Sequence, residues 1–143
     1  MNDNEDKTLL AIDYGTRRIG LAKSDSMGII AYALMTLEIK SSSEGIKKLN
    51  AVIDEYQPQG IVVGYPLLAS GDKSKKCKEI DNFIKKLQNI YKGPIHKVDE
   101  GYSSKEAENI IHAHGKKIRK DKKRIDRLAA VIILQRFLEE QTT

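Results

Sequence analysis

The chain has 143 residues and a formal net charge of +5 at pH 7, with 25 Lys and Arg residues against 20 Asp and Glu residues. Hydrophobic residues make up 40% of the chain, which is enough for a packed core. No apolar run reaches the roughly 18 residues that span a bilayer, and the single cysteine excludes an internal disulfide and a thiolate metal cage. We therefore expect one cytoplasmic domain over residues 8–140, with no membrane segment and with residues 1–7 as a disordered polar tail.

The N-terminal part of the chain predicts three strands in succession. Residues 9–12 form a continuous apolar run that ends in Asp13 and Gly15, and such a run is typical of a strand buried on both faces. A second strand is expected over residues 19–22. A turn signal then precedes a third strand over residues 29–39. Three short strands joined by tight turns predict an antiparallel meander.

Helical patterns alternate with strands in the rest of the chain. Ser41 and Glu44 have the spacing of a capping box, and Ser103 and Glu106 repeat it. The predicted elements after the meander are, in order, a helix after Ser41, a strand over residues 61–63, a helix over residues 77–90, a strand over residues 95–98, a helix after Ser103 and an amphipathic helix over residues 125–140.

The resulting order, βββαβαβαα, predicts a mixed five-stranded sheet. Crossovers between parallel strands are right-handed and carry helices across the faces of the sheet, so helices are expected on both faces. This is the order of the ribonuclease H-like fold. The expected fold class is therefore α/β and ribonuclease H-like.

Three acidic residues lie where predicted strands end or a helix begins. Asp13 closes the first strand, Glu100 follows Asp99 at the end of the last strand, and Asp126 is expected in the first turn of the final helix. Carboxylates gathered at one rim of a sheet repel one another unless a cation holds them, and Mg²⁺ or Mn²⁺ takes oxygen ligands. We predict that Asp13, Glu100 and Asp126 bind such an ion and catalyse phosphodiester hydrolysis.

Structural explanations also exist for two of these acids. Asp13 before Gly15 fits a turn former that binds its own backbone. Asp126 fits a helix N-terminal residue that the helix dipole favours. For each residue alone these explanations stay open. The joint occurrence at three matching places in the topology favours the metal role.

Positive charge is concentrated in the run before the final helix. Residues 116–124 hold seven cations in nine positions, and such clusters attract polyanions by releasing condensed counterions. We expect nucleic-acid contacts from this run and from two arginines after the first strand: Arg17, Arg18, Lys116, Lys117, Arg119, Lys120, Lys122, Lys123 and Arg124. The lysines within residues 73–78 fit phosphate contact and a solvated surface equally. The expected partner is nucleic acid, bound by a monomer or a homodimer.

Four sequence blocks carry a resemblance to a known family. They are residues 10–20 (LAIDYGTRRIG), residues 61–66 (IVVGYP) with Ser70 and Gly71, Asp99 and Glu100 with Ser103, Ser104 and Ala107, and residues 125–134 (IDRLAAVIIL). In this order and over about residues 9–140, they resemble the YqgF family, also described as Holliday junction resolvases of the RuvX type. The resemblance implies a ribonuclease H-like fold and a cytoplasmic bacterial protein. It also implies divalent-metal hydrolysis of phosphodiesters with Asp13, Glu100 and Asp126 as the matching acids, and maturation of the 5′ end of 16S rRNA.

The resemblance leaves the substrate open. Branched DNA is an alternative substrate, because the same family is discussed as a junction resolvase, and a non-catalytic RNA-binding ribosome-assembly factor is a second alternative. Actin-type ATPases share the Asp-Tyr-Gly-Thr block, but they need two such domains and this chain has room for one.

The chain departs from the family pattern at two adjacent positions near the predicted site. The family has arginine and leucine after the Asp-Glu pair, where this chain has Gly101 and Tyr102. An arginine there would be a natural phosphate contact, so Arg17, Arg18 or the basic run are the candidates to replace it. Glu100 is also expected to end a strand two spacings, roughly 9–10 Å, from the first.

Overall fold

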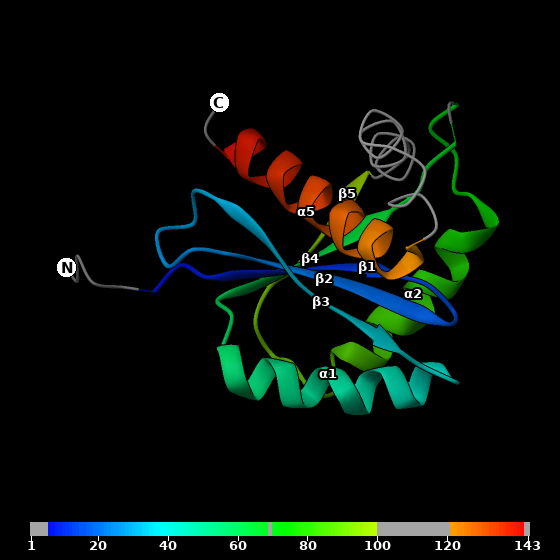
Figure 1. The fold of residues 1–143 in the computed structure, drawn as a ribbon. Coiled ribbons are helices and arrows are strands. Elements are labelled where there is room, and N and C mark those ends of the chain that lie inside the picture. Colours follow the sequence, from blue (N-terminus) through cyan, green and yellow to red (C-terminus); the bar gives the residue numbers. More distant parts are fainter. Residues whose placement is uncertain (1–5, 69, 100–120, 142–143) are drawn as a thin grey trace.

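The computed structural model describes residues 6–68, 70–99 and 121–141. The elements in these ranges are β1 (Leu9–Tyr14), β2 (Arg18–Ser24), β3 (Ala31–Glu38), α1 (Ser42–Tyr56), β4 (Gly60–Tyr65), α2 (Lys75–Leu87), β5 (Ile95–Asp99) and α5 (Lys122–Gln141) (Figure 1). They follow the predicted order. The helix predicted after Ser103 lies outside the described residues. None of the helices in the described ranges combines the length and the apolar composition that a membrane crossing needs.

The five strands form one mixed sheet in the order β3-β2-β1-β4-β5. The first three strands pair antiparallel, which confirms the predicted meander, whereas β4 pairs parallel with β1 and β5 pairs parallel with β4. β1 is therefore the central strand, with neighbours on both sides. Its residues from Leu10 to Tyr14 are all buried, as the continuous apolar run predicts.

Helices cover both faces of the sheet. Figure 1 shows α5 across one face and α1 and α2 against the other. Because successive strand residues point to opposite faces, β1 contributes Ile12 to the core under α1 and α2, and Ala11 to the core under α5. On α5, Ala129 and Ala130 are 1% and 0% exposed, so these small side chains let the helix lie close to the sheet.

Side-chain caps set where two helices begin. The Ser41 hydroxyl accepts a hydrogen bond from the Glu44 N–H at 3.1 Å, which confirms the predicted cap of α1. The carboxylate of Asp121 accepts one from the Arg124 N–H at 3.1 Å, so α5 begins at Lys122 and not at residue 125. Asp126 therefore lies beyond the first turn of α5, one turn further along than the sequence predicted.

β3 is shorter than predicted because a side chain forms the turn before it. The Asp25 carboxylate accepts hydrogen bonds from the N–H groups of Ile29 and Ile30, at 2.7 and 3.1 Å. These bonds keep both isoleucines in the connection between β2 and β3, where they are 66% and 50% exposed. The strand then begins at Ala31.

Candidate active site

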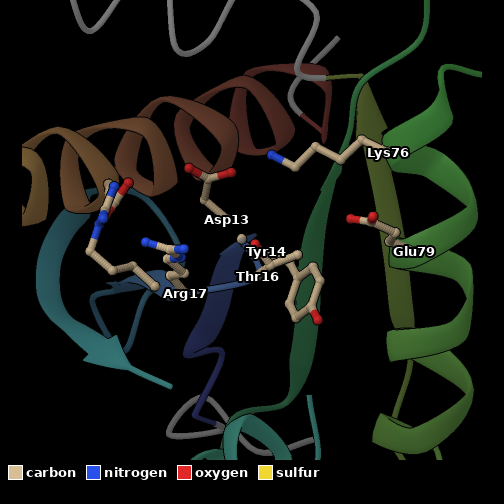
Figure 2. A pocket seen from close by; sticks show the side chains of 9 residues that line it. Asp13, Tyr14, Thr16, Arg17, Lys76 and Glu79 are labelled. Carbon is tan, nitrogen blue, oxygen red and sulfur yellow. The ribbon is translucent and has the colours of Figure 1, made fainter. Parts of the chain in front are cut away.

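A cavity of about 440 Å³ lies at the end of β1. It is lined by Asp13, Tyr14, Gly15, Thr16, Arg17, Arg18, Lys76, Glu79 and Asp126 (Figure 2). Two of the three predicted acids and both predicted arginines therefore share one cavity. The structure gathers these residues from β1, from the β1–β2 connection, from the start of β2, from α2 and from α5.

The glycine opposite Asp13 explains how Asp126 reaches this cavity. Asp13 pairs with Gly20 in the antiparallel β1–β2 ladder. A Cβ atom on Gly20 would lie 2.0 Å from the backbone oxygen of Asp126, far inside any real contact distance. The backbone of α5 therefore rests directly on β2 beside Asp13, and only glycine leaves room for it.

Asp126 forms an ion pair inside the cavity. Its Oδ2 lies 2.6 Å from the Nε of Arg18, and the two side chains are 19% and 33% exposed. The field of a helix N-terminus falls off within its first turn, and Asp126 lies beyond that turn. Arg18, and not the helix dipole, is thus the observed electrostatic partner of Asp126.

The other predicted contact residues divide into three groups. Arg17 is exposed and lines the cavity. Lys122, Lys123 and Arg124 are exposed at the start of α5, where the Lys123 Nζ lies 2.7 Å from a Glu38 carboxylate oxygen. The remaining predicted site residues lie outside the described residues: Glu100, Lys116, Lys117, Arg119 and Lys120.

Two residues of α2, Lys76 and Glu79, form one wall of the cavity, which we call the α2 wall. Phosphate contact was left open for Lys76 in the sequence, whereas Glu79 was not among the predicted site residues. Lys76 extends from α2 toward the Asp13 side of the cavity, and Glu79 points into the cavity one turn further along the helix (Figure 2). Burial raises the pKa of the Tyr14 phenol, and the charge of Glu79 adds to that rise. The available signal was the three-residue spacing of Lys76 and Glu79, which puts both on one side of the helix.

The donor chemistry of the cavity fits a hard divalent cation. Asp13 is 8% exposed, and it and Asp126 supply carboxylate oxygens to the same space. Mg²⁺ is commonly held by one or two carboxylates, with water and substrate phosphate completing its shell. Within residues 6–68, 70–99 and 121–141, no three acidic, His or Cys side chains are placed to share one ion. Asp13 and Asp126 are therefore the candidate ligands that the described residues bring to the cavity.

A separate charged cluster joins α2 to the parallel strands. Asp81 accepts hydrogen bonds from the Tyr65 hydroxyl and from the Lys97 Nζ, each at 3.0 Å, and the Lys73 Nζ lies 3.5 Å away. Burial by itself would raise the pKa of Asp81, but the bonds from Lys97 and Tyr65 and the two ammonium charges outweigh it. The pKa of Asp81 is therefore held below its ordinary value.

We expect Asp81→Asn to make folding stability less sensitive to acid. A carboxylate with a lowered folded pKa stabilises the fold above its unfolded pKa, and this contribution is lost as pH falls through the folded pKa. Urea midpoints measured from pH 5 down to pH 3 should fall less steeply for the variant than for the unaltered chain. Asp54→Asn, at an exposed position on α1, is the matched control. Equal slopes for all three proteins would contradict the assignment.

Comparison with known proteins identifies the family. A family model described as "RuvX: Holliday junction resolvase" matches residues 7–140. This chain belongs to the RuvX family. The resemblance read from the four sequence blocks is thereby confirmed.

Two relatives of this RuvX chain carry the name "Putative pre-16S rRNA nuclease". The relative from Koribacter versatilis is 41% identical over 133 residues, which cover 93% of this chain and 87% of the relative. The relative from Buchnera aphidicola is 43% identical over 128 residues, which cover 89% of this chain and 93% of the relative. The similarity thus extends over nearly the full length of each protein.

Two solved structures share the RuvX chain's fold. One is Thermus thermophilus RuvC in complex with a Holliday junction substrate, with a TM-score of 0.56, 13% identity, and coverage of 94% of this chain and 95% of that one. The other is the Fowlpox virus resolvase with substrate Holliday junction DNA, with a TM-score of 0.61, 12% identity, and coverage of 95% and 99%. At such low identity they speak for the fold alone, and they confirm the ribonuclease H-like prediction.

Two of the four sequence blocks of the RuvX chain, the first and the last, line the cavity in the structure. The first block supplies Asp13, Arg17 and Arg18, and the last block supplies Asp126. The block at residues 61–66 forms β4, which is followed by α2 with Lys76 and Glu79. Blocks that are far apart in the sequence therefore meet at one place in the fold.

Proposed function

We propose that this RuvX protein is a divalent-metal-dependent nuclease that hydrolyses phosphodiester bonds in the 5′-end processing of pre-16S rRNA. One observation carries the proposal. Asp13 from the central strand and Asp126 from the last helix line one cavity together with three cations, Arg17, Arg18 and Lys76. Acidic ligands beside phosphate-binding cations are the parts that metal-assisted phosphodiester hydrolysis needs.

Each residue has a role in this proposal. Asp13 and Asp126 would hold the Mg²⁺ or Mn²⁺, and Glu100 is the proposed third ligand. When bound, such an ion supplies a water activated for attack and neutralises charge that develops on the phosphate. Arg17 and Lys76 would hold the phosphodiester beside Asp13 and Asp126 in the cavity.

In this proposal the basic run extends the phosphate contacts beyond the cavity. Lys122, Lys123 and Arg124 lie exposed at the start of the helix that carries Asp126, so the backbone that flanks the scissile phosphate can contact them. We propose that Lys116, Lys117, Arg119 and Lys120 contact nucleic acid as well. Contacts of this kind position a nucleic acid without reading its sequence.

RNA is the first candidate substrate, and branched DNA is the second. The names of the relatives from Koribacter versatilis and Buchnera aphidicola support rRNA processing. The family description supports a four-way DNA junction. A nuclease that matures rRNA works where ribosomes assemble, so the first candidate places the protein in the cytoplasm.

The test offers both substrates to the purified full chain. A 5′-extended 16S rRNA fragment should be cut with Mg²⁺ or Mn²⁺, and EDTA should stop the reaction. A four-way DNA junction is assayed in parallel. Cutting of the junction with intact RNA would favour the second candidate. Salt-sensitive binding of both nucleic acids, without cleavage under either metal, would indicate a non-catalytic nucleic-acid-binding protein in place of an enzyme.

A further inference from the structure

The ion pair between Arg18 and Asp126 involves a carboxylate that the proposed metal also needs. Arg18 is the first residue of β2, and its Nε lies 2.6 Å from Oδ2 of Asp126. That distance is short even for a charge-assisted hydrogen bond. With Arg18 in this position, one oxygen of Asp126 is occupied and a full positive charge lies next to the cation site.

We propose that Arg18 and the divalent cation are alternative partners of Asp126, and that a nucleic-acid phosphate draws Arg18 away and makes Asp126 available to the metal. This inference rests on the proposed function. It assigns to Arg18 the coupling between substrate and metal, in addition to a contact with substrate. Arg18 is thus a positioning residue that acts through Asp126.

The packing of α5 decides which partner moves. The backbone of Asp126 rests on Gly20, where even a Cβ atom has no room, so Asp126 cannot retreat toward β2. The Arg18 side chain is one-third exposed and lines the same open cavity as Arg17 and Lys76. A guanidinium binds a phosphate with two parallel hydrogen bonds, so a phosphodiester in the cavity competes directly with Asp126 for Arg18.

Thermodynamic linkage turns this competition into cooperativity. If the phosphate removes Arg18 from Asp126, nucleic acid raises the affinity for metal, and metal raises the affinity for nucleic acid by the same factor. Couplings between two sites of this kind are typically about 5- to 150-fold. The chain would therefore bind metal weakly alone and tightly with its substrate.

The test measures Mn²⁺ binding to the full chain by electron paramagnetic resonance, without nucleic acid. Arg18→Gln should lower the Mn²⁺ dissociation constant about fivefold or more relative to the unaltered chain, the lower end of typical coupling. Arg17→Gln, which removes the same charge from the same cavity, is the matched control and should have a smaller effect. Arg18→Lys keeps the charge but lacks Nε and should lie between. Circular dichroism checks the fold of each variant.

A second measurement adds a 2′-O-methyl stem–loop RNA, with the Mn²⁺ that the RNA binds by itself subtracted. The RNA should tighten Mn²⁺ binding about fivefold or more in the unaltered chain, and much less in Arg18→Gln. Equal Mn²⁺ affinity of the Arg17 and Arg18 variants, or an RNA without effect on the unaltered chain, would overturn the coupling and leave the nuclease proposal standing. Absence of Mn²⁺ binding in every protein would overturn both.

Discussion

Asp13→Asn should slow cleavage by about 10²–10⁴-fold, because a bound metal contributes several kcal/mol to the transition state and each 1.4 kcal/mol is a factor of ten. Asparagine keeps the shape of the side chain but loses the charge that attracts the cation. The fold should persist, since Asp13 is 8% exposed and a neutral amide is easier to bury than a carboxylate. Single-turnover cleavage of the RNA fragment and thermal melting are the two measurements.

Glu79→Gln is the matched control for this prediction. Glu79 lines the same cavity but belongs to the α2 wall, and it does not share a three-ligand group with Asp13 and Asp126 within the described part of the chain. Its loss should change the rate by less than about tenfold, within the range of a single charge contact. Full cleavage by a folded Asp13→Asn variant would remove the metal role of Asp13.

Gly20→Ala should damage both stability and the site. The added Cβ would meet the Asp126 backbone at 2.0 Å for the oxygen and 2.4 Å for the carbonyl carbon, and backbone atoms yield only if α5 moves away from β2. Overpacking of this kind costs about 3 kcal/mol, which lowers Tm by on the order of 10 °C in a domain of this size. Displacement of α5 also separates Asp126 from Asp13, so Mn²⁺ binding should weaken.

Gly45→Ala separates this effect from a general intolerance of added volume. A Cβ atom at Gly45 would lie 3.0 Å from Ile19 Cδ1 and 3.3 Å from Ile39 Cδ1, so side-chain methyl groups and not backbone atoms would have to shift by a few tenths of an ångström. Alanine is also preferred over glycine within a helix by up to about 1 kcal/mol. The Tm of Gly45→Ala should therefore stay close to that of the unaltered chain. If Gly20→Ala melts at the same temperature as Gly45→Ala, the close approach of α5 to β2 is not a constraint.

The order of strands and helices could be predicted because most elements have a local signal in the sequence. The continuous apolar run of β1 and the capping-box spacing at Ser41 both correspond to features of the structure. Boundaries failed where one polar side chain decides them. Asp25 holds Ile29 and Ile30 out of β3, and Asp121 starts α5 before residue 125. A hydrogen bond from one carboxylate leaves no periodic pattern in the sequence.

The candidate site could be predicted in part. Asp13 and Asp126 were identifiable because the sequence pattern places each near the end of a predicted element, and the family blocks contain both. The ion pair between Arg18 and Asp126 and the position of Glu79 in the α2 wall were not predicted. These features depend on how closely two elements approach, which is decided by Gly20 and by the packing of α5.

The way α5 covers the sheet has a consequence during synthesis of the chain. Ala11, Ala22 and Val62 lie in the core beneath α5, yet all five strands precede that helix in the chain. A nascent chain that has emerged from the ribosome as far as residue 99 contains every strand, but the apolar surface that α5 later covers is still exposed. Domains form as their segments emerge, and exposed apolar surface invites aggregation. Docking of the last helix therefore both covers the apolar surface of the nascent chain and brings Asp126 to the cavity beside Asp13.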